Sequence, residues 1–230
     1  MKRRVSGPRK DSTNPQTIAA VITAAGKSIR MAGVRKALAL VDGVPVLKKA
    51  VDAFADSGKV GPIVITYPPG EADLQSVFGG GDSDFIWVAG GETRQESVYN
   101  ALLALNEHAP EYVLIHDAAR PWVSWELIDA VLRGTIQYGA CIPVVPHVNA
   151  PKQVNDLGEI IAHFDRAVVL GAQTPQGFRF ADIFSAHQTA MKNGLDYPDD
   201  AEAYHHAVGS VFTVPGDPAN RKITFKYDLS

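Results

Sequence analysis

The feature that most constrains the fold is an alternation, along most of the chain, of short apolar runs with segments of helical periodicity. The apolar runs are rich in β-branched residues, which predicts strands. Continuous apolar character is typical of strands that are covered on both faces, as in parallel sheets. The predicted strands cover residues 17–23, 62–67, 84–89, 112–116 and 140–145.

Helical periodicity occupies the stretches between these runs. A first helix is expected between Pro45, which suits a first helical turn, and Gly58, which ends one. Two more are predicted over 93–107 and 124–138, and Ser124 is a suitable N-cap for the second of them. Strands that alternate with such helices indicate an α/β fold, a Rossmann-like and mainly parallel sheet with helices on both faces.

The segment 150–166 departs from this alternation. Two short strand-like runs flank Asn155-Asp156-Leu157-Gly158, a sequence that favours a tight turn. We therefore expect an inserted β-hairpin, with 146–167 as an arm of the domain. An isolated two-stranded hairpin is marginally stable in water and needs a partner surface. The pattern alone leaves open whether the hairpin folds back onto its own domain or clasps a second subunit.

Residues 18–230 contain no repeat or linker, so one domain is expected, preceded by a basic, polar and disordered tail over residues 1–17. A net charge of −3 gives no reason to expect a nucleic-acid partner. No run approaches the roughly 20 apolar residues of a membrane span. The single cysteine, Cys141, indicates a reducing compartment, and we expect a cytoplasmic protein.

Small residues and then cations follow the first predicted strand. Ala24, Ala25 and Gly26 allow a base or a phosphate to approach main-chain N–H groups, and Arg30 and Lys36 follow them. An ordinary turn with solvated cations is the alternative. A Walker phosphate loop is excluded, because the position of its first glycine falls inside the strand.

Two further strand ends carry polar residues, and ligands of open α/β sheets bind beyond the carboxyl ends of strands. Gly90 and Gly91 lie after the third predicted strand with Arg94 and Ser97 close behind, where a simple turn and helix cap is the alternative. Asp117 and Arg120 follow the fourth, where a structural ion pair is the alternative. Three such strand ends on one sheet favour an anion-binding site. The sequence shows no cluster of metal-ligating residues.

Five motifs, in their order along the chain, resemble those of the 2-C-methyl-D-erythritol 4-phosphate cytidylyltransferase family of the non-mevalonate isoprenoid pathway. They are AAGKSIRM, GGETRQESV, HDAARP, AQTPQGF and NRKIT, and the resemblance covers residues 18–230. It implies transfer of CMP from CTP to 2-C-methyl-D-erythritol 4-phosphate with release of pyrophosphate. It also implies Mg²⁺ held mainly by the CTP phosphates, and a homodimer joined through the arm.

In the implied reaction a phosphate oxygen of the acceptor attacks the α-phosphorus of CTP. The nucleophile is already an anion, so catalysis consists of positioning and electrostatic stabilisation. By the resemblance, Arg30 and Lys36 stabilise the transition state. Lys222 positions the acceptor, and Arg166 holds its phosphate from the neighbouring subunit.

The resemblance also implies the binding residues on each side. Those that contact the nucleotide through backbone are Ala24, Ala25 and Gly26; those around the cytosine and ribose are Gly91, Glu92 and Ser97. Asp117 and Arg120 face the methylerythritol side.

Two departures from the family pattern fall on the acceptor side. Asn149-Ala150-Pro151-Lys152 stands where Asp-Thr-x-Lys is common, and Lys152 or His147 is a candidate to replace the lost threonine. Pro198 stands where the family often has a second threonine.

Two alternatives remain open. One is a related cytidylyltransferase for another polyol phosphate, such as ribitol 5-phosphate. That branch typically reads His-Asp-Ala-Val-Arg where this chain has residues 116–120, HDAAR. The other is a nucleotide-binding relative without catalysis, although all four implied catalytic cations are present.

Overall fold

The computed structural model describes residues 17–26, 35–78 and 85–229. The predicted tail, apart from Thr17, and the predicted catalytic residue Arg30 lie outside these ranges. Within the described part, no helix is long and apolar enough to cross a bilayer.

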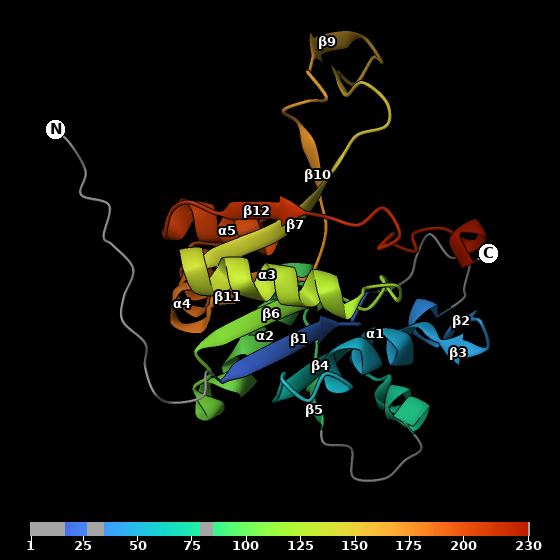
Figure 1. Cartoon of the computed structure of the whole chain (residues 1–230), viewed down its shortest axis with the longest axis vertical. Coiled ribbons are helices and arrows are strands. Elements are labelled where there is room, and N and C mark those ends of the chain that lie inside the picture. Colours follow the sequence, from blue (N-terminus) through green and yellow to red (C-terminus); the bar gives the residue numbers. More distant parts are fainter. Residues whose placement is uncertain (1–16, 27–34, 79–84, 230) are drawn as a thin grey trace, which may run out of the picture.

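A mixed sheet of eight strands forms the centre of the molecule (Figure 1). Its order is β10-β7-β11-β6-β1-β4-β5, with β12 on the other side of β7. The neighbours β6, β1, β4 and β5 are parallel, whereas β11 runs antiparallel between β6 and β7. The bounds are β1 Ile18–Thr23, β4 Ile63–Tyr67, β5 Phe85–Ala89, β6 Tyr112–Asp117, β7 Ala140–Pro146, β10 Leu170–Ala172, β11 Gln176–Arg179 and β12 Phe212–Pro215. All five predicted strands are confirmed.

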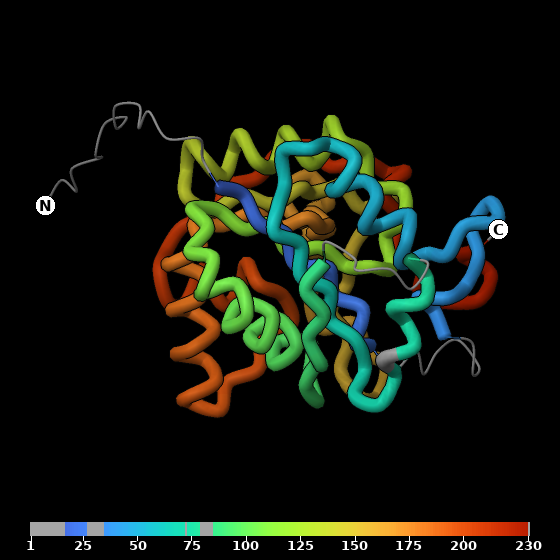
Figure 2. Tube along the Cα trace, turned by 90° about the horizontal axis from the view of Figure 1, so that it is seen from below, coloured from blue at the N-terminus to red at the C-terminus, as the bar shows by residue number. Residues whose placement is uncertain are grey.

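Helices cover both faces of this sheet, as predicted. Figure 2 shows α3 on one side of the strands, and α2 and α4 on the other. On the first face α1 and α3 pack against the sheet, and on the second α2, α4 and α5 do so. The bounds are α1 Val46–Ala55, α2 Arg94–Leu105, α3 Trp125–Tyr138, α4 Phe180–Lys192 and α5 Asp200–Ala207. The sequence predicted the first three but missed α4 and α5.

The helix starts are fixed by local hydrogen bonds that the sequence encodes. The Thr93 side chain accepts from the Glu96 N–H and Glu96 reaches back, a capping box for α2. Ser124 accepts from the Leu127 N–H at the start of α3. Pro45 lies immediately before α1, at its N-cap.

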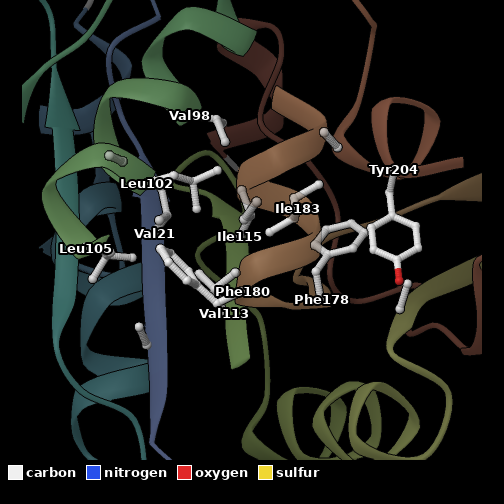
Figure 3. Packing of buried hydrophobic residues seen from close by; sticks show 14 of the residues in the cluster. Val21, Val98, Leu102, Leu105, Val113, Ile115, Phe178, Phe180, Ile183 and Tyr204 are labelled. Atoms are coloured by element: carbon white, nitrogen blue, oxygen red, sulfur yellow. The ribbon is translucent and has the colours of Figure 1, made fainter. Parts of the chain in front are cut away.

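The core on the second face joins residues that are distant in sequence (Figure 3). Val21 of β1 and Ile115 of β6 are fully buried there, together with Leu102 of α2 and Ile183 of α4. Phe178 of β11 packs beside Tyr204 of α5, with ring centroids 5.3 Å apart. Burial of each such side chain stabilises the fold by about 1.5–3 kcal/mol, so the strands that carry the site have a rigid support.

Small elements connect these parts. β2 (Leu40–Val41) and β3 (Val44–Pro45) pair as a short hairpin. Short 3₁₀ helices cover Lys36–Leu38, Ala72–Phe78, Asn106–His108 and Lys226–Leu229. Ile223, in the C-terminal segment, is fully buried against Val41 and Val46, which fixes that segment beside the β2–β3 hairpin.

The predicted hairpin arm is present and projects from the body beyond β7 and β10 (Figure 1). β8 (Lys152–Val154) pairs antiparallel with β9 (Ile160–His163), and the Asn155 side chain accepts from the Leu157 and Glu159 N–H groups in the turn. Nearly all hairpin residues are exposed, so the hairpin does not fold back onto its own domain.

Candidate active site

A cavity of about 710 Å³ lies beyond the carboxyl ends of β1, β5 and β6. All three strand ends that the sequence singled out contribute to it. The residues that line it and were predicted for the site are Ala24, Ala25, Gly26, Lys36, Gly91, Glu92, Ser97, Asp117 and Lys222.

Two loops pack closely beside the cavity, the one after β1 that carries Ala25 and the one after β5 that carries Gly90. A β-carbon on Gly90 would collide with the Ala25 side chain and would lie 2.8 Å from Ser97 Oγ. The Ala24 N–H donates to Thr66 O at 3.2 Å, which anchors the loop after β1 to β4. Position 90 must therefore stay a glycine, because an added β-carbon would meet the side chains of Ala25 and Ser97.

The turn before α2 uses its polar groups internally. Ser97 Oγ accepts from the Gly91 N–H at 3.1 Å and donates to Thr93 O at 2.9 Å. The Glu92 N–H donates to Glu96 Oε2 at 2.6 Å. Ser97 is 4% exposed, so its hydroxyl shapes the loop that carries Gly91 and Glu92.

Asp117, at the end of β6, is the centre of an ion-pair cluster. Its Oδ2 lies 2.7 Å from Lys222 Nζ and 3.8 Å from Arg120 Nε. Its Oδ1 accepts from Arg94 Nε and from Thr23 Oγ1, each at 3.3 Å. Burial alone would raise the pKa of this carboxyl, but Arg94, Lys222 and Arg120 outweigh burial and hold the pKa well below its usual range. Asp117 is therefore ionised at neutral pH.

His116 supports the turn that follows Asp117. Burial lowers the pKa of His116 to about 4 despite the neighbouring Asp117, so the imidazole is neutral at pH 7. Thr174 Oγ1 accepts from the Asp117 N–H, which leaves its hydroxyl to donate to His116 Nδ1 at 3.0 Å. His116 Nε2–H then donates to Arg120 O at 3.1 Å. This tautomer fixes both ends of the Asp117–Arg120 turn.

A second cavity of about 180 Å³ adjoins the first. Arg94, Asp117 and Lys222 line both cavities and form a shared wall. Arg120 lines the smaller cavity and donates from Nη1 to Asn220 O at 2.8 Å. Pro198 lines it too, without a hydroxyl.

The ion pair of Asp117 and Arg120, which the sequence left open as an alternative, is present but is only one part of this cluster. Their 3.8 Å separation is the longest of the Asp117 contacts, and Lys222 and Arg94 are its closer cations. The sequence placed Arg94 close behind a strand end and the resemblance gave Lys222 a role, but neither could show that the two cations meet one carboxylate.

Arg166 is separate from both cavities in this chain. It lies after β9 at the base of the arm, is exposed, and donates from Nη1 to Val148 O at 3.3 Å. Lys152 and His147, the candidates to replace the lost threonine, are also exposed and line neither cavity.

Thr23, Arg94 and Asp200 are site residues that the sequence analysis did not assign. Arg94 Nη2 lies 2.7 Å from Oδ2 of Asp200, which is fully buried at the start of α5. Their separation of 106 residues left no local signal of the pairing. Among the described residues, no group of three or more His, Cys, Asp and Glu is arranged to hold a metal ion.

The fold and the cavity define the class: an α/β protein with a cation-lined ligand cavity at the carboxyl ends of parallel strands. The family model for 2-C-methyl-D-erythritol 4-phosphate cytidylyltransferase, IspD, matches residues 18–230. The chain therefore belongs to this family.

Relatives and solved structures agree with that assignment. The chain is 39% identical over 219 residues to the bifunctional enzyme IspD/IspF of Bradyrhizobium sp. strain ORS 278, covering 94% of this chain and 56% of that protein. It thus spans little more than half the length of this relative. The 2-C-methyl-D-erythritol 4-phosphate cytidylyltransferase of Thermus thermophilus superposes with a TM-score of 0.77 and 30% identity, covering 93% and 96% of the two chains. That of Francisella tularensis gives 0.80 and 28%, covering 93% and 97%.

Proposed function

We propose that the protein transfers CMP from CTP to 2-C-methyl-D-erythritol 4-phosphate and releases pyrophosphate, a step of isoprenoid precursor biosynthesis. The observation that carries the proposal is the pair of adjoining cavities in a chain of this family. A large and a small ligand that occupy them meet at one wall, made of Arg94, Asp117 and Lys222. Such an arrangement suits a group transfer between two bound substrates.

The larger cavity is assigned to CTP. Its volume of about 710 Å³ is within the usual range for ligand sites. Ala24, Ala25 and Gly26 offer backbone contacts to the nucleotide, and Gly91 and Glu92 face the same space. Ser97 acts indirectly, because its hydroxyl holds the Gly91 turn.

Catalysis in this proposal is electrostatic. The attacking phosphate oxygen of the acceptor is already anionic, so no strong base is needed, and Asp117, with its low pKa, would be a poor one. Lys36 lines the CTP cavity and, with Arg30, would stabilise charge on the α-phosphate. Lys222 and Arg120, on the smaller cavity, would hold the acceptor.

Mg²⁺ fits this site as a metal that the substrate brings. Mg²⁺ commonly binds one or two carboxylates together with substrate phosphates, and Glu92 lines the CTP cavity. Asp117 and Glu71, which also line it, already pair with cations of the chain. When bound, the metal would neutralise charge on the phosphate oxygens.

The arm is assigned to a homodimer interface. Its large apolar side chains are exposed in a single chain, which favours a partner surface. They include Val148, Val154, Leu157, Ile160, Ile161 and Phe164. Arg166 on this arm reaches neither cavity of its own chain, which favours a role at the partner's acceptor site.

A second candidate substrate is another polyol phosphate such as ribitol 5-phosphate. It is supported by Pro198, which gives the smaller cavity a wall without a hydroxyl. Pyrophosphate release from CTP and Mg²⁺, measured in parallel with each acceptor, decides between them. Release with methylerythritol phosphate alone supports the proposal, and release with ribitol phosphate alone replaces it. CTP binding without release from either would indicate a non-catalytic relative.

A further inference from the structure

A continuous network of polar side chains runs from His187 of α4 to the wall between the two cavities. His187 Nε2 lies 3.1 Å from Asp200 Oδ1, and Arg94 Nη2 donates to Asp200 Oδ2 at 2.7 Å. Arg94 Nε continues to Asp117 Oδ1, and Asp117 Oδ2 meets Lys222 Nζ. This polar network thus joins α4, α5, α2, β6 and the C-terminal segment.

The two residues at the inner end of this polar network, His187 and Asp200, are costly to bury. Asp200 is fully buried and His187 is 1% exposed, so an unpaired carboxylate there would be strongly destabilising. Burial raises the pKa of Asp200, but Arg94 and His187 outweigh it and lower the pKa to about 2. Asp200 is therefore a buried anion that requires its arginine.

Arg94 occupies a position that its own helix disfavours. It is the first residue of α2, where the helix dipole repels a cation. Two carboxylates, Asp200 and Asp117, offset that repulsion and raise the pKa of Arg94, although burial acts in the opposite direction. With both acids bound, the guanidinium is committed to side chains of its own protein.

The planar guanidinium also fixes the separation of the two acids. Nη2 binds Asp200 and Nε binds Asp117, so one rigid group bridges the core and the cavity wall. Asp117 is thereby held from behind and presents its other oxygen to Lys222. Lysine, with a single point charge on a flexible stem, cannot reproduce this bridge.

We propose that His187, Asp200 and Arg94 are positioning residues that fix Asp117 and Lys222 at the wall where the acceptor phosphate meets the nucleotide. This inference rests on the proposed function. Arg94, Asp117 and Lys222 line both cavities, but they make up a larger share of the smaller cavity, and Asp199, which precedes Asp200, lines only the smaller one. Binding and turnover of the acceptor are therefore expected to change first when a residue of the polar network is replaced.

The test compares Asp200→Asn and Arg94→Lys with a matched control, Asp182→Asn. Asp182 also lies in the first turn of a helix and pairs with an arginine, Arg179, at 3.5 Å, but away from both cavities. For the two test variants, kcat/KM for the acceptor is expected to fall by about 10- to 100-fold, the scale of a misplacement of about 1 Å. KM for CTP should change by less than about threefold, since most contacts of the larger cavity are untouched.

Crystal structures of the same variants give a readout that does not need activity. Displacement of the Asp117 carboxylate from Lys222 is expected in both, and an unchanged Asp117–Lys222 contact would overturn the proposal. Equal losses of kcat/KM for CTP and for the acceptor, together with a lowered melting temperature, would show that the polar network has only a structural role. That result would overturn the proposal as well. If Asp200→Asn does not fold, Arg94→Lys carries the same comparison. Failure of the proposed function appears separately, as a wild-type protein that releases no pyrophosphate.

Discussion

The carboxyl edge of the sheet and the projecting arm differ in which side chains they bury and which they expose. At the sheet edge, charged side chains are buried and paired within the chain, as Asp117 is with Arg94 and Lys222. On the arm, apolar side chains such as Leu157 and Ile161 are exposed, at 91% and 54%. The first region satisfies its charges within the chain, whereas the second leaves apolar surface uncovered in a single chain. Substitutions at the sheet edge should therefore change turnover, whereas substitutions on the arm should change assembly.

The largest expected effect on turnover is at the sheet edge. Lys36→Ala removes a cation from the CTP cavity and should lower kcat by about 10²-fold or more, the scale of a lost electrostatic donor. Steady-state pyrophosphate release measures it. Lys49→Ala is the matched control, because Lys49 pairs with Asp42 at 2.7 Å and does not line the cavity. A near wild-type rate for Lys36→Ala would refute the assigned site.

The next prediction concerns the arm, and the expected result is the recovery of activity in mixed dimers. If Arg166 acts on the partner's site, Arg166→Ala and Lys36→Ala homodimers are each inactive, but a mixed dimer has one site with both residues intact. Random mixing of co-expressed subunits should then restore about a quarter of wild-type activity, since half the dimers are mixed and half their sites complete.

The same mixing experiment separates the arm from the body. If Arg166 served its own chain, no site in a mixed dimer would hold both residues, and activity would stay near that of the single variants. Full activity of an Arg166→Ala monomer would contradict the assignment of Arg166 altogether.

A smaller effect is expected where the loops that carry Gly90 and Ala25 touch beside the cavity. Gly90→Ala places a methyl group against Ala25 and Ser97 and should lower the free energy of unfolding by about 1–3 kcal/mol. Denaturant unfolding measures the change, and CTP affinity should fall with it. Gly26→Ala is the control for stability, because its added carbon would meet nothing within 4 Å. Equal stability of the two variants would show that the loops are not tightly packed.

The smallest effect on stability is expected on the arm. Ile161→Asp exchanges an exposed apolar side chain, so the unfolding free energy of the body should change by no more than about 0.5 kcal/mol. The molecular mass from light scattering should nevertheless fall to that of one chain. Leu195→Asp, an exposed substitution on the body, should leave the assembly unchanged. A dimer that survives Ile161→Asp would contradict the arm as interface.

The predicted and missed elements differ in the strength of their local patterns. The strands over 17–23 and 112–116 are continuous apolar runs, and the helix over 124–138 has an N-cap and an apolar face, so local rules were sufficient. β11 was missed because Gln176–Arg179 is short and contains Gly177, which is a poor strand signal. The β-structure there depends on the neighbouring β6 and β7, which the strand pairs with antiparallel.

The sequence by itself determined three of the helices and five strands of the sheet, the position of the cavity at the strand ends, and the existence of the arm. Each follows from periodicity or from residues that are close in the chain. Only the tertiary structure decided which charges meet, because Asp117, Lys222, Arg94 and Asp200 come from four separate elements. Charge pairing over such sequence distances depends on how the helices pack on the sheet, and no local pattern encodes that packing.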